Sequence, residues 1–229
     1  MKRLVGSFLV FVLTLANFSF AHASEQPAIT KEFVKEAELS VIRDDKGERV
    51  VLLSNVEEIA TLARTGEKTH AQTTVAILGE SEEETARIIE NIKKLKGGAG
   101  HFTEDGWFYG SSVYLSSTVY YTTRPIGDLG FSVISLSKVT MQCTTNSGSS
   151  VNSMTLTMVQ HGPSYPDAVF RTQSTSFNAK TARSFNAPSS WYAVDMSSGL
   201  TAVGAAIDCT AIRSGGGSST FRLPNNIIG

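Results

Sequence analysis

Short apolar runs alternate with serine and threonine through the part of the chain after residue 97, and glycine, proline and asparagine interrupt them. From Met154 to Met158, for example, methionine and leucine occupy one phase and threonine the other. Successive side chains of a strand point to opposite faces, so this alternation predicts strands with one buried and one solvated face. We expect about seven strands, near residues 113–121, 131–143, 154–158, 168–172, 191–195, 201–212 and 219–223. Their number and spacing predict a mainly β fold, an antiparallel β-sandwich.

The first residues indicate export. Lys2 and Arg3 precede an uncharged apolar run that reaches about residue 20 and ends in an Ala-His-Ala site at residues 21–23. Positive charge, apolar core and small-residue cleavage site in this order predict a signal peptide over residues 1–23. An uncleaved anchor is the alternative, but a run of about 17 residues is near the lower limit for a membrane span. We therefore expect a secreted, extracellular protein with no membrane span after signal cleavage.

The charge content changes sharply near residue 97. Residues 24–96 hold 11 basic and 15 acidic side chains, whereas the longer segment 97–229 holds only 7 and 6. The change coincides with Gly97-Gly98-Ala99-Gly100, a composition typical of flexible hinges. We therefore expect a small charged α+β region at 24–96, a hinge at 97–100 and a β-sandwich domain at 101–229. The charged region could alternatively be a removable pro-region.

Local patterns predict four elements within the charged region. A hairpin is expected over residues 38–54, because two β-prone runs flank an Asp-Asp-Lys-Gly turn. A capping box beginning at Ser54 predicts a short helix that reaches about Ala63. A strand is expected over residues 73–78. A second capping box at Ser81 predicts a helix that ends at Gly97, with apolar residues at helical spacing.

Two cysteines fall on the apolar phase of their strands. Cys143 follows Val139 and Met141 at two-residue spacing, and Cys209 follows Ile207 in the same way. If the two strands lie in facing sheets, both thiols point toward each other. In an exported chain such a pair predicts a disulfide, with two buried free thiols as the alternative. Immunoglobulin-type sandwiches have a comparable pair, but the tryptophan expected after the first cysteine is missing, so we infer no membership of that family.

An aromatic cluster opens the β-rich part of the chain. Aromatic faces on a rigid sheet stack on sugars or contact other proteins. We take Trp107, Tyr109 and Tyr114 as the candidate ligand-binding platform. Tyr114 joins the other two rings only if a bulge near Gly110 shifts the phase of the strand. The alternative is that these β-prone rings build the core and its rim.

No motif for catalysis, a metal or a cofactor stands out. A G-x-S-x-G elbow and an H-E-x-x-H pattern are both missing. His101 lies near Glu104 and Asp105, but this spacing indicates a surface turn rather than a metal site. The two adjacent carboxylates point opposite ways on an extended chain, so they do not flank one glycosidic bond. We predict no catalytic residues, no metal and no cofactor.

Binding or surface interaction is the function that these patterns favour. The general composition resembles that of small exported bacterial proteins. The partners we expect are carbohydrate, cell wall or another protein. Nucleic acid is not expected, because no basic stripe is present. The competing hypothesis is a secreted hydrolase made as a precursor with residues 24–96 as its pro-region. A small toxin or inhibitor is a third hypothesis, for which the sequence offers nothing specific.

Overall fold

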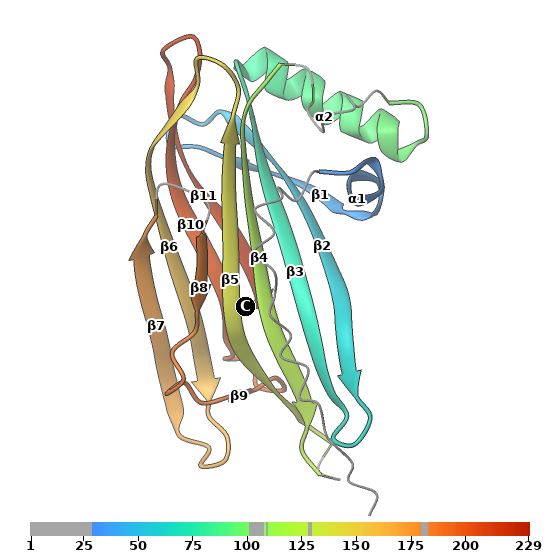
Figure 1. Ribbon diagram of the computed structural model, residues 1–229, viewed down its shortest axis with the longest axis vertical. Coiled ribbons are helices and arrows are strands. Elements are labelled where there is room, and N and C mark those ends of the chain that lie inside the picture. Colours follow the sequence, from blue (N-terminus) through green and yellow to red (C-terminus); the bar gives the residue numbers. More distant parts are fainter. Residues whose placement is uncertain (1–28, 101–107, 109, 128–129, 180–182) are drawn as a thin grey trace, which may run out of the picture.

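Two antiparallel sheets pack face to face in the computed structural model of the chain (Figure 1). The structure describes residues 29–100, 108, 110–127, 130–179 and 183–229. Strands account for 61% and helices for 11% of the structure. The antiparallel β-sandwich preceded by a small α+β region, as expected from the sequence, is confirmed.

Sheet A has seven strands in the order β1-β2-β3-β4-β5-β8, and β9 also pairs with β5. Its strands are β1 (Glu38–Arg43), β2 (Arg49–Leu62), β3 (Glu67–Gly79), β4 (Ser111–Pro125), β5 (Ser132–Thr145), β8 (Arg183–Asn186) and β9 (Val194–Asp195). Sheet B has four strands in the order β11-β10-β6-β7. They are β6 (Ser150–Pro163), β7 (Phe170–Asn178), β10 (Ala202–Ile212) and β11 (Ser218–Ile228).

The alternating sequence pattern builds the core between the sheets. On β6, Met154, Leu156 and Met158 are completely buried, while Thr155 lies exposed on the opposite face. The same core receives apolar side chains from β4, β5, β10 and β11. Burying each large apolar side chain stabilises the fold by roughly 1.5–3 kcal/mol, so this interface is a main source of stability.

One end of sheet A is buried on both faces. Val50 and Leu52 of β2 face sheet B, whereas Val51 and Leu53 belong to a second core on the other face. Two helices, α1 (Lys31–Glu36) and α2 (Glu82–Lys96), cover this second face (Figure 1). The prediction of α2 is confirmed: the Ser81 side chain caps it, and its buried face is formed by Ile88, Ile92 and Leu95.

The helix predicted from Ser54 to about Ala63 is wrong, because this segment continues β2. It pairs with β3 along its length, from Val51 opposite Ile77 to Leu62 opposite Glu67. The Ser54 hydroxyl bonds to the Thr74 hydroxyl of β3 at 3.0 Å and does not cap a helix. A four-residue capping pattern is a weak local signal, and the pairing partner supplied by the fold outweighs it.

The other predicted strands are observed, with shifted ends. Residues 191–195 contribute only the two-residue strand β9, and the predicted 168–172 strand is the start of β7. The short elements α1 and β8, with six and four residues, were not predicted because they offer no periodic signal. None of the helices in the described ranges is long and apolar enough to cross a membrane.

The strands on either side of the predicted hinge belong to the same sheet. β3 precedes Gly97 and β4 follows it, yet they pair from Lys68 opposite Thr123 to Gly79 opposite Ser111. The charged region and the β-rich part therefore share sheet A. Removal of residues 24–96 as a pro-region stays a prediction, and it would take β1, β2 and β3 out of that sheet.

A polar turn clamps the two sheets together at one end of the molecule, which we call the clamp end. The Asp44 carboxylate, in the β1–β2 turn, accepts hydrogen bonds from the backbone N–H groups of Lys46 and Glu48 at 2.9 and 2.8 Å. It also accepts one from the Ser219 hydroxyl of β11 at 2.6 Å. Asp45 adds a reciprocal pair of backbone and side-chain bonds with Thr220. The first hairpin of the chain is thereby fixed to its last strand.

We expect Asp44→Ala to lower the free energy of unfolding by about 2 kcal/mol, because two backbone donors and one hydroxyl lose their buried acceptor. Urea denaturation measures this loss. The matched control is Asp208→Ala, which removes an exposed ion pair with Arg222 and should cost less than about 1 kcal/mol. Equal losses in the two variants would contradict the clamp.

Candidate functional site

The structure places Tyr114 in the helix-covered core and not on a ligand-binding face. Its side chain is only 8% exposed and packs with Val75, Ile77 and Phe108. Its hydroxyl accepts a hydrogen bond from the Phe108 backbone N–H at 2.6 Å. Tyr114 therefore matches the alternative interpretation, a structural ring. The other two members of the predicted platform, Trp107 and Tyr109, lie outside the described residues.

The two cysteines face the core between the sheets, as their strand phase predicts. Cys143 is half-buried on β5 of sheet A, and Cys209 is buried on β10 of sheet B. The thiols are not bonded to each other in the structure, so the predicted disulfide is not seen. Burial raises the pKa of each thiol to about 12, and nearby Cys143 adds to the rise at Cys209. As neutral thiols, both pack like small apolar side chains.

The described residues contain no cluster of three or more metal-ligating side chains. His101, Glu104 and Asp105, which we interpreted as a surface turn, lie outside the described residues. The two described histidines bond to threonine hydroxyls: His70 to Thr123 at 3.1 Å and His161 to Thr172 at 2.7 Å. These hydrogen bonds are to hydroxyls and not to the carboxylate that orients a catalytic base, although Glu58 lies opposite His70 in the β2–β3 ladder.

A pocket opens between the two sheets at the end opposite the clamp. We call it the end pocket, and the end of the molecule that contains it the pocket end. Its walls come from β3, β4 and β5 of sheet A, from β11 of sheet B and from the segment after β9. Its volume is about 520 Å³, and it is a shallow depression that is widely open to solvent. Pockets of this size accommodate small organic molecules.

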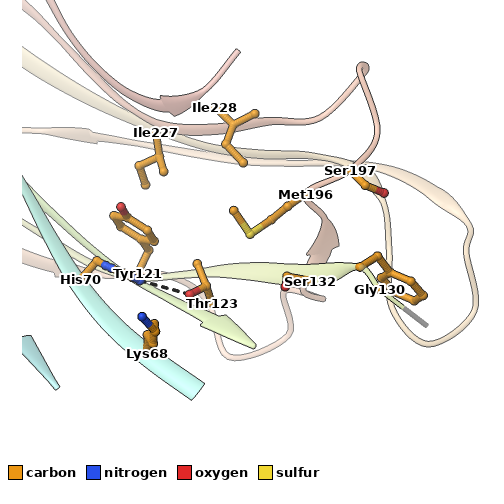
Figure 2. Close-up of a pocket in the computed structure, with 11 residues that line it drawn as sticks. Lys68, His70, Tyr121, Thr123, Gly130, Ser132, Met196, Ser197, Ile227 and Ile228 are labelled. Carbon is orange, nitrogen blue, oxygen red and sulfur yellow. Dashed lines mark hydrogen bonds between the residues drawn. The ribbon is translucent and has the colours of Figure 1, made fainter. Parts of the chain in front are cut away.

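Apolar side chains form the inner part of the end pocket. Figure 2 shows Ile227 and Ile228 of β11 facing Tyr121 of β4, with Met196 beside them. Phe131 also lines the pocket. The phenol of Tyr121 is protonated at neutral pH, as that of an ordinary tyrosine is, and burial raises its pKa further, so its hydroxyl can donate a hydrogen bond. This surface suits an apolar group that carries little or no charge.

The register of sheet A holds Tyr121 in place. Tyr121 lies directly opposite His70 on β3, and their rings stack with centroids 4.9 Å apart and planes inclined by 17°. His70 Nε2 bonds to the hydroxyl of Thr123, two residues further along β4 (Figure 2). One wall of the pocket is therefore a rigid aromatic pair fixed by two neighbouring strands.

Polar groups line the outer part of the end pocket and carry little net charge. Lys68 Nζ lies 2.9 Å from Glu58 Oε2. Hydrogen bonds from Thr61 and Lys68 lower the pKa of Glu58, so this carboxylate is ionised and balances the lysine. Hydroxyls from Thr123, Ser132 and Ser197 complete the polar lining. The arrangement suits a ligand with an apolar body and an uncharged or dipolar polar end.

The end pocket was not predicted from the sequence. Tyr121 is the last residue of the strand predicted over residues 113–121, and Met196 and Ile227 lie beyond the ends of the predicted strands. The only available signal was the phase of β4, where Tyr121 follows the core residue Val119 at two-residue spacing. That phase places the ring inward, where it is only 6% exposed, but it does not say that a pocket opens beside it.

Comparison of this chain with protein-family models, with curated proteins and with solved structures finds no match.

We expect Tyr114→Phe to lower the free energy of unfolding by about 1–2 kcal/mol, because the buried Phe108 N–H loses its acceptor. Thermal and urea denaturation measure the loss. The control is Tyr120→Phe on the same strand, whose ring lies against Lys138 on the more exposed face and should change stability by less than about 0.5 kcal/mol. If Tyr114→Phe were as stable as the parent, the structural role of this hydroxyl would be wrong.

Proposed function

We propose that this protein is a secreted, extracellular binding module without catalytic activity. Its end pocket would hold a small molecule with an apolar body and an uncharged or dipolar polar end. The end pocket is the observation that carries this proposal: an apolar interior, a rigid aromatic wall and hydroxyls near the opening meet at one place. Such combinations of apolar surface and few polar groups are typical of ligand sites.

The hydroxyl partners of the histidines argue against hydrolysis. A nucleophile needs a base, and the base needs a third group to orient it. Among the described residues, His70 and His161 each bond to a threonine hydroxyl rather than to a carboxylate. A carbohydrate, cell-wall or protein partner remains the alternative for the aromatic platform, which now depends on Trp107 and Tyr109 alone.

The precursor hypothesis has to account for the shared sheet. Cleavage near residue 97 would remove β3 and expose the backbone of β4, a 15-residue strand now paired along most of its length. It would also remove Asp44, which joins the first hairpin to Ser219 of β11. Exposed edges of this length promote aggregation. These contacts favour a mature protein that retains residues 24–96.

We also propose that Cys143 and Cys209 form a disulfide in the exported protein. Both thiols lie on the inward faces of facing strands, and the sequence separation is 209 minus 143, or 66 residues. Closing a loop of this length stabilises the folded chain by about 4 kcal/mol in the chain-entropy model. Oxidation would have to occur before the core closes, because a buried neutral thiol is a poor nucleophile.

The intact mass of protein recovered from the culture medium tests export, processing and the disulfide together. We expect a chain that starts at Ser24, lacks the two thiol hydrogens and takes up no iodoacetamide when denatured without reductant. The same sample, reduced first, should take up two alkyl groups. A start near residue 97 would support the precursor hypothesis, and a start at Met1 would exclude the signal peptide. Two alkylated cysteines without reduction would exclude the disulfide.

Met196→Trp should fill the end pocket and weaken binding of N-phenyl-1-naphthylamine, an uncharged apolar fluorophore with one N–H, by about tenfold. Fluorescence titration measures the affinity. The control is Ile212→Trp, which adds a similar ring at the clamp end of sheet B and should bind the probe like the parent. Melting temperatures show whether both variants are folded. A parent protein that does not bind the probe, or equal binding by both variants, would contradict the pocket proposal.

A further inference from the structure

Strand β7 forms one edge of sheet B. It lies at the outer left of the molecule in Figure 1 and pairs with β6 alone. Backbone bonds fix the phase of this ladder at both ends, from Ser164 N–H to Val169 C=O and from Ala179 N–H to Met154 C=O. Because antiparallel ladders bond alternate residues, the odd-numbered residues of β7 direct their N–H and C=O groups to β6. The even-numbered residues direct theirs away from the sheet.

Five residues of β7 therefore present backbone donors and acceptors at the edge. They are Phe170, Thr172, Ser174, Ser176 and Asn178, and their side chains are exposed on the outer face of sheet B. Among the described residues, no backbone or side-chain group bonds to the outward N–H and C=O groups of these five. Such a row of unpaired groups is a template for pairing with another strand.

The opposite edge of sheet B, strand β11, is protected. Thr220 directs both of its backbone groups outward, and Asp45 bonds to both, at 2.9 and 2.8 Å. The outward carbonyl of Asn226 accepts a hydrogen bond from Gln72 Nε2 at 2.7 Å. Pro224, at the same phase, has no N–H to offer. Side chains of sheet A and a proline thus occupy much of the edge that another strand would need.

The edges of sheet A carry the usual protective features as well. β1 and β8 are only six and four residues long. The part of β2 beyond the end of β1 contains Glu57 and Glu58, and its register shifts between Glu58 and Ala60. Short strands, charges and bulges all discourage edge pairing. β7 has nine residues, a regular register and no proline or lysine, so it differs from every one of these edges.

We propose that β7 pairs with β7 of a second copy of this chain, antiparallel about a two-fold axis at Ser174. This register sets Ser174 opposite itself, Thr172 opposite Ser176 and Phe170 opposite Asn178. All five outward residues are even-numbered, so each faces another outward residue and exchanges two backbone hydrogen bonds with it. The four strands of each sheet B join into one continuous sheet of eight strands.

The side chains of β7 are compatible with this register. Thr172 of one copy faces Ser176 of the other, which is the kind of hydroxyl pair that Thr157 and Ser176 already form at 3.0 Å within sheet B. Arg171 is the one charged residue of β7, and Asp167 balances it at 2.8 Å. The two copies of Arg171 are six residues apart along the strands, or about 20 Å, so no like charges meet.

These features favour a second copy over a strand from a different protein. A foreign strand is selected through pockets for its alternate side chains. The outward side chains of β7 between Phe170 and Asn178 are instead small hydroxyl groups, which match one another across a two-fold axis. The symmetry itself then sets the register, because only pairing centred on Ser174 satisfies all of the outward backbone groups.

Pairing through β7 does not involve the end pocket, which is built from β3, β4, β5, β11 and the segment after β9. Because the two β7 strands run in opposite directions, the pocket end of one copy lies beside the clamp end of the other. The two pockets of the dimer open in opposite directions. Failure of probe binding and failure of dimerisation are therefore separate results.

Sedimentation velocity of the mature exported protein over a concentration series tests the pairing. An edge-to-edge contact is small for a protein interface, so we expect a reversible dimer with a Kd on the order of 10 µM. Ser174→Pro removes an outward N–H that β6 does not use and should weaken dimerisation at least about tenfold. The matched control, Arg222→Pro, places the same ring on the outward side of β11 and should dimerise like the parent.

A charge exchange at the axis tests the register. Ser174→Lys and Ser174→Glu each set like charges directly opposite each other and should weaken dimerisation about fivefold at low salt. An equimolar mixture of the two variants should regain the affinity of the parent, because lysine then faces glutamate. Ser153→Lys adds the same charge to the outer face of β6, away from the edge, and should have no effect.

Four results would overturn the proposal. They are a parent that stays monomeric at about 100 µM, which is tenfold above the expected Kd, equal losses in the two proline variants, a mixture that does not regain affinity, and open-ended assemblies larger than a dimer. Circular dichroism and melting temperature show whether each variant is folded. The lysine and glutamate variants keep the test decisive if proline unfolds the strand, because Ser174 is exposed on the outer face.

Discussion

The ladder between β3 and β4 is the interaction on which the rest of the molecule depends. It joins the charged first part of the chain to the β-rich second part over twelve residue pairs. Near one end it sets Ile77 opposite Tyr114 beneath α2, and near the other it sets His70 opposite Tyr121 in the end pocket. One ladder thus determines both the helix-covered core and the aromatic wall of the candidate site.

Tyr114 and Tyr121 show how strand phase assigns different roles to the same residue type. They lie seven residues apart on β4, and an odd spacing places their rings on opposite faces of sheet A. Tyr114 faces α2 and has a backbone donor for its hydroxyl, whereas Tyr121 faces the interior beside Ile227. Aromatic residues that lie close together in the sequence therefore occupy two separate environments in the structure.

The presence of the strands, the class of the fold and the choice of side chains that point inward were predictable. Each of these depends on the two-residue alternation of side chains along a strand. The phase of Cys143 and Cys209 toward facing sheets follows from it, as does the burial of Met154. The helix predicted after Ser54 was wrong because the capping motif depends only on neighbouring residues. The structure of this segment is decided by its pairing with Thr74, which lies far away in the sequence. The end pocket depends on where two sheets stop covering each other, and no periodic pattern records that.

Asn225 of β11 marks the place where the closed core becomes the end pocket. Its side-chain Nδ2 donates to the backbone carbonyls of Gln72 on β3 and Ser117 on β4, at 3.0 and 2.8 Å, and so ties the two sheets together. On the clamp-end side of this bridge, the inward residues of β3 and β4 are mainly apolar, and their burial holds the sheets close. Beyond it the inward residues include His70, Lys68 and Thr123, whose burial against sheet B would cost free energy. The apolar contacts at this end, such as those of Tyr121, Met196 and Ile227, therefore do not extend to the edge of the sheets, and the sandwich remains open where the ligand site is proposed.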